Sequence, residues 1–565
     1  VTVDHREPQT RAVEQPALFA KLSDDSLLSV GVPADWLADV RAADEERFLD
    51  LTAHLPGEAA EALLEYISTG TLRRPAPPRL ADPYAHPDAQ RHIRLVTGEE
   101  ELRLALEYPW ERWSVFLHPS QRAVVDRRYA GPARVSGSAG TGKTVVALHR
   151  AVRLARSNPN ARVLLTTYSE PLADLLQSKL KVLAPESGAI IPRITVRDLP
   201  GIADELFQLV RGRRPRIVSA NLLRSLIAHA AEEAGVKGFA PRFLSSEWTH
   251  VIDAWGIDSV GRYATVPRLG RRTPLSPRQR QRLWSVFEQV SVALRDQGLF
   301  TRAGVYRHLG THYGTALRKP FDYIVVDEAQ DLGPAELAFL GMVCAQGDDT
   351  LFFAGDIGQR IFQHPFSWRA LGIDVRGRSA NLKVCYRTSR QIRTMADHLL
   401  PSALRDPDGN EEERKGTVSL FDGPVPDVRL LKDTPEEIAQ VANFLRSAIS
   451  DGINANEIGI FVRSPEAIER ARAAVEAAGP NSSAATVSVM HLAKGLEFRA
   501  VVVMAFDYEF LPLASRIAEA ADEDDLDDIY ETERQLLYVA CTRARDRLFV
   551  SGLVPGSELL KNLQG

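Results

Sequence analysis

One glycine-rich stretch constrains the fold of this chain more than any other feature. Residues 137–144 read Gly-Ser-Ala-Gly-Thr-Gly-Lys-Thr, which fits the pattern G-x-x-x-x-G-K-[ST]. The residues before it are typical of the end of a strand, and those after it carry apolar side chains at helical spacing. Glycines let the backbone wrap closely around phosphate oxygens, and the N-terminus of the following helix directs N–H groups at them. The stretch therefore predicts a phosphate-binding loop between a strand and a helix of an α/β fold.

The side chains of this loop indicate how a nucleoside triphosphate would be held. We expect the Lys143 ammonium at the β and γ phosphates and the Thr144 hydroxyl on Mg²⁺, so ATP and Mg²⁺ are the predicted cofactors. A glycine turn with a purely structural role is the alternative, but strand, loop, Lys-Thr pair and helix all agree with the nucleotide site. The remaining predicted nucleotide contacts in the loop are Gly137, Ser138, Ala139, Gly140, Thr141 and Gly142.

Polar residues after two later strands supply what such a site still lacks. Asp327 and Glu328 follow the apolar run 323–326. We expect Asp327 to hold Mg²⁺ through its coordination shell and Glu328 to position and deprotonate the attacking water. A helix cap would explain one acidic residue here, but not both. A further apolar run, 350–354, leads into a polar turn that contains Gln359, and ligands of doubly wound sheets bind at the carboxyl ends of strands.

Composition limits the class of protein. The chain has 565 residues, 44% hydrophobic and 25% charged, as in ordinary soluble globular proteins, and its length corresponds to about four domains. No apolar run approaches the roughly 18 residues of a membrane span, so no membrane association is expected. The three cysteines, Cys344, Cys385 and Cys541, are far apart and form no C-x-x-C pair, which argues against zinc and iron–sulfur sites. A reducing, cytoplasmic location is the expectation.

Charge is distributed unevenly along the chain. The net charge is -5, but residues 1–110 carry -9 whereas residues 211–320 carry +12. A separate basic segment is a candidate track for nucleic-acid phosphates. A solvated, arginine-rich surface explains the same charge equally well.

The pattern of helices, strands and prolines predicts five segments. Residues 1–71 have amphipathic helical spacing, and prolines at 75, 77, 78, 83 and 87 indicate an extended linker. The acidic run 522–528 fits no metal spacing and is expected to be a solvated loop. The predicted segments are a helical accessory unit with its linker (1–92), the first part of an α/β core (93–190), a helical basic insertion (191–320), the rest of that core (321–380) and a second core (381–565).

Six further stretches follow the phosphate loop in a fixed order. They read VDEAQD (326–331), GDIGQRIF (355–362), CYRTS (385–389), IGIFVRS (458–464), HLAKGLEF (491–498) and LYVACTRAR (537–545). With the loop, they resemble the motifs of superfamily 1 helicases of the UvrD/Rep/PcrA type, and the resemblance covers residues 117–550. Any one stretch is a weak signal, whereas seven in the order of the family are not a coincidence.

The resemblance implies two RecA-like P-loop NTPase domains with ATP between them. It places Gln121 and Tyr386 at the adenine and Glu497 near the ribose, and a glutamine amide is suited to paired hydrogen bonds with an adenine edge. Gln359 would sense the γ phosphate. Arg387 and Arg543, from the second core, would act as arginine fingers that stabilise charge on the transferring phosphoryl group. Hydrolysis would then be coupled to closure of the cleft.

The resemblance also implies a path for DNA. Tyr168 and Trp368 are the expected platforms for unpaired bases, and a buried core aromatic is the alternative for each. The other expected DNA contacts are Phe362, Arg369 and His491. The sequence departs from the family at Val489, where a threonine is usual, and in an insertion at 363–368. Between residues 463 and 487 there is room only for a helix and a strand, which predicts a compact form without the large second accessory domain.

These features predict an ATP-dependent DNA helicase or translocase that moves 3′ to 5′ on single-stranded DNA, with the direction taken from the resemblance alone. One alternative is an ATP-gated DNA-binding subunit of a repair or phage-defence complex that does not unwind by itself. Another is an ATPase that acts on RNA. Single-stranded DNA and DNA junctions are the expected partners, and a protein partner could bind the N-terminal unit.

Overall fold

The computed structural model describes most of the chain in two compact units, residues 1–101 and 102–565. The described residues are 17–30, 32, 36–44, 47–48, 51, 55, 57–69, 72, 116–184, 190–266, 275–356, 359, 366–401, 403–405, 407–409, 411–413, 416–517 and 523–564. The proline-rich segment predicted as a linker lies outside them apart from Leu72.

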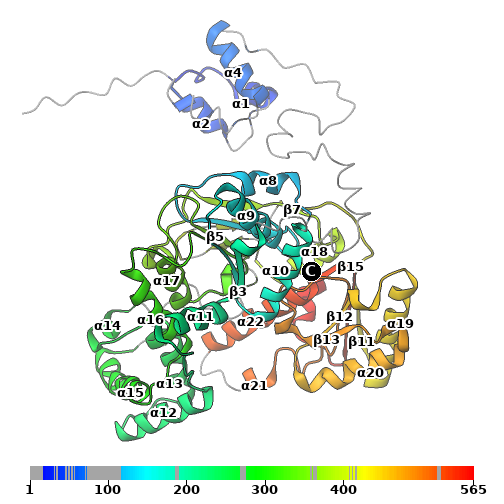
Figure 1. The fold of residues 1–565 in the computed structure, drawn as a ribbon. Helices are drawn as coiled ribbons and strands as arrows, with labels where there is room; N and C mark the ends of the chain where they lie inside the picture. The colour runs from blue at the N-terminus through cyan, green and yellow to red at the C-terminus, as the bar shows by residue number, and fades with distance from the viewer. Residues whose placement is uncertain are drawn as a thin grey trace, which may run out of the picture. The chain divides into compact units, whose positions relative to one another are not determined.

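The N-terminal unit is a small helical bundle with its own core. Its helices are α1 (Asp24–Ser29), α2 (Leu37–Ala42) and α4 (Gly57–Thr69) (Figure 1). Ser23 caps α1 by accepting a hydrogen bond from the Ser26 backbone N–H at 3.2 Å. Phe19 and Phe48 pack edge to face, with ring centroids 4.8 Å apart, at the centre of the buried cluster. Amphipathic spacing predicted helices within residues 1–71, and these three helices lie in that range.

The second unit begins with a six-stranded parallel sheet, which confirms the predicted α/β fold. Its strand order is β3-β2-β4-β5-β1-β6. The strands are β1 (Ala133–Gly137), β2 (Val163–Thr167), β3 (Ile194–Asp198), β4 (Tyr323–Val326), β5 (Leu351–Ala354) and β6 (Ser379–Leu382). The helices that accompany it are α8 (Pro119–Asp126), α9 (Lys143–Ser157), α10 (Glu170–Leu183), α11 (Leu199–Arg211), α16 (Arg302–Gly314) and α17 (Pro334–Val343).

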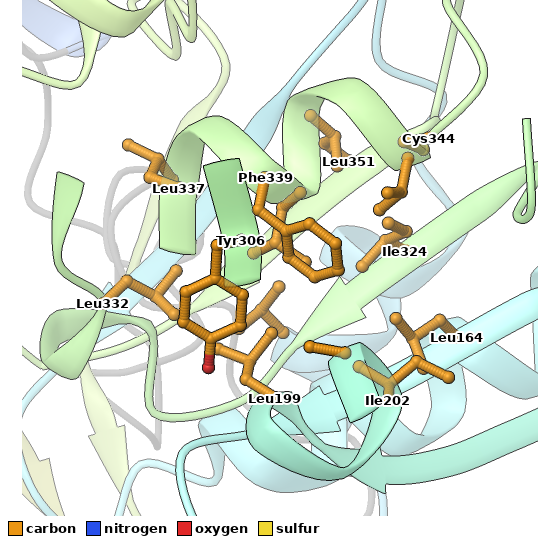
Figure 2. Close-up of a cluster of buried hydrophobic side chains, with 14 of the residues drawn as sticks. Leu164, Leu199, Ile202, Tyr306, Ile324, Leu332, Leu337, Phe339, Cys344 and Leu351 are labelled. Carbon is orange, nitrogen blue, oxygen red and sulfur yellow. The ribbon is translucent and has the colours of Figure 1, made fainter. Parts of the chain in front are cut away.

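Both faces of this sheet are buried, and neighbouring residues of each strand contribute to opposite faces. Leu164 and Ile324 lie in the cluster formed with α11, α16 and α17, where Figure 2 shows them near Leu199, Tyr306 and Phe339. The next residues along the same strands belong to the other cluster, with α8, α9 and α10. This double burial explains why the strands read as continuous apolar runs that end abruptly in polar loops.

The helical insertion is smaller than predicted. Its elements are α12 (Ala220–Glu233), α13 (Pro241–Glu247), the π-helix η4 (Trp248–Asp253), α14 (Val260–Thr265) and α15 (Pro277–Asp296), which share one core (Figure 1). The chain enters and leaves it side by side, because Val218 N–H donates to the Phe300 carbonyl at 2.9 Å. The predicted start at residue 191 is wrong, since β3 is the edge strand of the sheet and α11 packs on the core of that sheet. Only Ile194 and Val196 of β3 are buried, as suits an edge strand, so β3 lacks the continuous apolar run that marks the central strands.

A second parallel sheet has the order β11-β15-β14-β12-β13. Its strands are β11 (Asp427–Leu431), β12 (Ile458–Val462), β13 (Thr486–Val489), β14 (Phe498–Val503) and β15 (Ala544–Leu553). Helices α19 (Thr434–Ser450) and α20 (Ile468–Ala478) share one hydrophobic cluster with it, and α18 (Arg390–Asp397), α22 (Glu523–Cys541) and α23 (Leu560–Gln564) share the other. One short α-helix, α20, connects β12 to β13, as the spacing predicted.

Two expectations about this region need correction. The boundary predicted after residue 380 falls inside β6, which pairs with β1 of the first sheet. The acidic run at 522–528 is not a loop from Glu523 onward, because α22 starts there. Carboxylates are favourable in the first turn of a helix, where they complement its dipole.

The remaining short elements complete the second unit. They are α21 (Ala514–Ile517), the paired strands β7 (Val384–Cys385) and β10 (Val418–Ser419), the hairpin β8 (Ala403–Arg405) with β9 (Glu411–Glu413), and 3₁₀ turns at Ile191–Arg193, Ala329–Asp331, Arg369–Leu371, Ala455–Glu457, Pro465–Ala467, Pro480–Ser482 and Met490–Leu492. Among the residues placed in the structure, no helix combines the length and apolarity needed to cross a bilayer.

Candidate nucleotide-binding cleft

The phosphate-binding loop joins β1 to α9, as the motif predicts. Gly142 caps α9 with φ +79°, a left-handed conformation that suits glycine. A side chain on Gly142 would also lie only 1.8 Å from the Tyr386 hydroxyl. The Lys143 ammonium donates to the carbonyls of Gly137 at 2.6 Å and Ser138 at 3.0 Å. It also lies 3.6 Å from the Asp356 carboxylate, so the loop is held around its lysine.

The two predicted magnesium ligands meet beside this loop. Asp327, at the end of β4, is buried and accepts a hydrogen bond from the Thr144 side chain. Burial raises the pKa of Asp327 to about 7, with a further contribution from the negative charge of Glu328. A divalent cation would favour the ionised carboxylate. Mg²⁺ takes few protein oxygens and keeps waters and phosphate oxygens, so this pair fits a nucleotide-bound Mg²⁺.

The backbone and one neighbour orient the predicted base. Glu328 has φ +55°, an unusual left-handed conformation for a residue with a side chain. Gln330 donates from Nε2 to the Glu328 carboxylate at 2.5 Å and accepts the Asp356 N–H at 2.9 Å. Gln330 was not among the predicted site residues, although it lies in the same motif stretch as Glu328.

The predicted adenine contacts form a network within the protein. Gln121 and His118 make a reciprocal cap at the start of α8, in which Gln121 Oε1 accepts the His118 N–H at 2.9 Å. Gln121 Nε2 donates to the Thr141 carbonyl and to the Tyr386 hydroxyl, both at 2.7 Å. Burial lowers the pKa of His118 to about 4 and raises that of Tyr386 to about 12, so both rings are neutral near pH 7. Both ends of the Gln121 amide are therefore engaged, and the predicted pairing with adenine requires these bonds to be exchanged.

Side chains of the second core line the same pocket as Lys143 and Glu328. Arg543 donates to Gln359 Oε1 at 3.1 Å and to the Val539 carbonyl at 3.0 Å. Arg543, a predicted arginine finger of the second core, therefore contacts Gln359, the predicted γ-phosphate sensor of the first core.

The second predicted finger is held by an acidic partner. Arg387 pairs with the Glu497 carboxylate, which also lies 3.3 Å from the Lys179 ammonium of α10. Burial would raise the pKa of Glu497, but these two cations outweigh it and hold the pKa below its ordinary value. The predicted ribose contact of Glu497 therefore competes with its ion pairs.

Lys494 is a cleft residue that the sequence analysis missed. Its ammonium, from the second core, donates to the Asp331 carboxylate at 2.5 Å and to the Gln359 carbonyl at 2.7 Å, both in the first core. It lies 3.9 Å from Glu328. Lys494 occupies the middle of the stretch 491–498, where only His491 and Glu497 were considered.

The two aromatic residues predicted to contact DNA differ in exposure and packing. Tyr168 is 39% exposed between β2 and α10. Trp368 is half-buried, with its ring centroid 4.8 Å from that of Phe353 and the Arg134 guanidinium 5.6 Å away, so the indole packs on the first core. This packing agrees with the alternative of a core aromatic, and base stacking on Trp368 stays a prediction.

Of the other predicted DNA residues, Arg369 and His491 are among the described residues. Arg369 is exposed, and His491 is half-buried, with a pKa lowered by burial and by Arg463. Phe362 lies outside the described residues, as do Gln363, His364 and Pro365 of the insertion before Trp368. The basic pair Arg271 and Arg272 also lies outside them.

Comparisons with known proteins agree with this geometry. The family described as "AAA domain" matches residues 120–365, and the "UvrD-like helicase C-terminal domain" family matches residues 471–554. The "ATP-dependent DNA helicase UvrD2" proteins of Mycobacterium tuberculosis (strain ATCC 25618 / H37Rv) and Mycobacterium bovis are each 25% identical to the chain over 359 residues. That match covers 59% of this chain and 50% of each relative, so the chain spans about half the length of the curated relatives it matches.

A solved structure, the C-terminal domain of a possible DNA helicase from Lactobacillus plantarum WCFS1, covers 32% of this chain and 93% of its own, with 22% identity and a TM-score of 0.21. Its superposition is too poor to add to the fold assignment. The two matched families and the curated relatives, together with the cleft between two parallel-sheet cores, support the resemblance of this chain to UvrD-like superfamily 1 helicases.

Proposed function

We propose that this chain hydrolyses ATP in the cleft between its two cores and uses closure of the cleft to move 3′ to 5′ along single-stranded DNA and separate strands. The observation that carries the proposal is the contact of Arg543, from the second core, with Gln359, from the first. This contact lies in the pocket that also contains Lys143 and Glu328. A residue supplied by the opposite core makes turnover depend on the arrangement of the two cores.

Each residue of the cleft has a distinct role in this proposal. Lys143 holds the β and γ phosphates, and Glu328, oriented by Gln330, accepts a proton from the attacking water. Thr144 and Asp327 hold Mg²⁺, which neutralises phosphate charge when bound.

Gln359 detects the γ phosphate and Arg543 stabilises its charge in the transition state. Arg387 joins Arg543 once Glu497 releases it, and Lys179 remains as the partner of that carboxylate. Tyr386 borders the adenine, together with Gln121 once its amide bonds are exchanged.

DNA is proposed to bind through aromatic and basic side chains. Tyr168 is the better candidate for base stacking, because Trp368 is packed on the core. The basic segment 211–320 would follow the phosphates, and Arg369, His491 and Phe362 would be further contacts to the DNA. Single-stranded DNA and junctions are therefore the proposed substrates.

A second candidate is a DNA-binding ATPase that switches a partner protein without unwinding DNA. The short connection between β12 and β13 favours it, since only α20 and 3₁₀ turns lie between these strands. An ATPase that acts on RNA is the third candidate.

A strand-displacement assay separates the three candidates. Duplexes with a 3′ tail, with a 5′ tail and with an RNA tail are incubated with ATP and Mg²⁺, with Lys143→Ala as the inactive control. The proposal expects displacement of the 3′-tailed DNA duplex only. ATP hydrolysis stimulated by DNA without displacement would favour the switch, and a preference for RNA would favour the third candidate.

A further inference from the structure

The phosphate-binding loop itself touches the second core. Ala139 is 3% exposed and packs in the hydrophobic cluster of the second core. Its backbone N–H donates to the hydroxyl of Tyr538, on α22, at 3.1 Å. The hydroxyl of Ser138 donates to that of Thr417 at 3.4 Å. Two adjacent loop residues therefore have hydrogen-bond partners in the other half of the cleft.

The next loop residue is enclosed by the second core. The Gly140 carbonyl accepts the Tyr386 N–H at 3.3 Å. A side chain on Gly140 would come within 2.6 Å of the Cys385 sulfur and 2.9 Å of the Thr388 hydroxyl oxygen. The loop thus forms a close interface with the second core, and a relative movement of the cores must change these contacts.

Tyr538 connects this interface to the predicted arginine finger. It lies near the end of α22, and Arg543 follows at the start of the turn into β15. The Thr542 hydroxyl donates to the Tyr538 carbonyl at 2.7 Å, and Arg543 Nε donates to the next carbonyl, that of Val539. The helix end therefore fixes the position of Arg543 relative to Tyr538.

We propose that Tyr538 is a positioning residue for ATP hydrolysis: its hydroxyl, bound to the Ala139 N–H, holds the phosphate-binding loop in register with Arg543. This inference rests on the proposed function, because it gives the hydroxyl a role only if Arg543 acts on the phosphates. Tyr538 is 1% exposed, so its ring also fills the core. The two contributions separate experimentally, because phenylalanine keeps the ring and removes only the hydroxyl.

The test compares two Tyr→Phe variants on one helix. Tyr538→Phe removes the hydroxyl that accepts the Ala139 N–H of the phosphate-binding loop. Tyr530 also lies on α22, and Tyr530→Phe removes a solvent-exposed hydrogen bond in which the Tyr530 hydroxyl donates to the Glu558 carboxylate at 2.9 Å. We measure kcat, the affinity for a fluorescent ATP analogue and the melting temperature, with saturating single-stranded DNA. A hydrogen bond worth about 1 kcal/mol corresponds to about a fivefold change, so kcat of Tyr538→Phe should fall about fivefold. Affinity should stay within about twofold, and Tyr530→Phe should match the wild type.

A double-mutant cycle shows whether Tyr538 acts through Arg543. In an Arg543→Ala background, Tyr538→Phe should cause no further fall in kcat. An equal fall in both backgrounds, or an unchanged kcat with a lower melting temperature, would mean that Tyr538 is only a core residue and would overturn the inference. If the wild type hydrolyses ATP no faster than Lys143→Ala, both the proposed function and this inference are wrong.

Discussion

Removing Arg543 tests whether the second core supplies catalytic charge. The Arg543 guanidinium is mostly buried and donates to Gln359 Oε1 and to the carbonyls of Val539 and Leu496. A missing arginine finger costs on the order of 10³ in rate, or about 4 kcal/mol of transition-state stabilisation. The three hydrogen bonds contribute about 1 kcal/mol each to the folded state. Arg543→Ala should therefore lower kcat about 1000-fold while the protein remains folded.

The assay separates turnover from binding. Single-turnover hydrolysis gives the chemical step, and titration with a fluorescent ATP analogue gives the affinity, which should change by less than about tenfold. Arg547→Ala is the matched control: this arginine lies four residues later on β15 and pairs with Asp451 at 2.5 Å, where Asp451 is largely exposed. That surface pair is worth at most about 1 kcal/mol, so kcat should not change. Equal losses of affinity and kcat in Arg543→Ala would refute the finger and leave Arg543 as a structural link between the cores.

Three further predictions concern the cleft and the DNA path. Lys143→Ala should abolish hydrolysis, whereas Glu328→Gln should bind ATP and lose turnover; a Glu328→Gln rate near wild type would exclude Glu328 as the base. Tyr168→Ala should weaken single-strand binding about tenfold with little change in melting temperature, because stacking is worth about 1–3 kcal/mol per base; unchanged affinity would exclude it from the DNA path. Replacing Arg271 and Arg272 should reduce the slope of log affinity against log salt concentration for single-stranded DNA by about 0.7 per lost phosphate contact, without changing DNA-free hydrolysis. An unchanged slope would mean that these arginines do not contact DNA phosphates.

The sequence was sufficient where chemistry is encoded by short contiguous patterns. The phosphate loop, the Asp327–Glu328 pair and the first parallel sheet were predicted because glycine spacing and buried strands that end in polar turns leave clear local signals. The second core was expected from the resemblance alone. Gln330 and Lys494 were missed although they lie within motif stretches. Their roles depend on partners up to 163 positions away, as in the Lys494–Asp331 pair, and no local pattern reports such a partner.

The features that the sequence did not reveal depend on contacts between distant residues. The edge strand β3 buries only Ile194 and Val196, and its pairing with β2 rather than its own pattern places it in the first sheet. The predicted contact of Gln121 with adenine stays a prediction, but the sequence did not reveal that its amide is engaged in a helix cap and in a bond to the Thr141 carbonyl. Trp368 follows a predicted sensor loop, yet its half-burial is set by Phe353 and Arg134, which lie on other strands. Tertiary packing decides each of these cases.

The most direct measurement of the central claim is the rate of Mg²⁺-dependent ATP hydrolysis with and without single-stranded DNA, in the wild type and in Lys143→Ala. If ATP binds in the cleft and DNA promotes its closure, single-stranded DNA should stimulate hydrolysis by the wild type. Lys143→Ala should not hydrolyse ATP with or without DNA. Equal rates in the two proteins, or a wild-type rate that does not respond to DNA, would contradict the central claim.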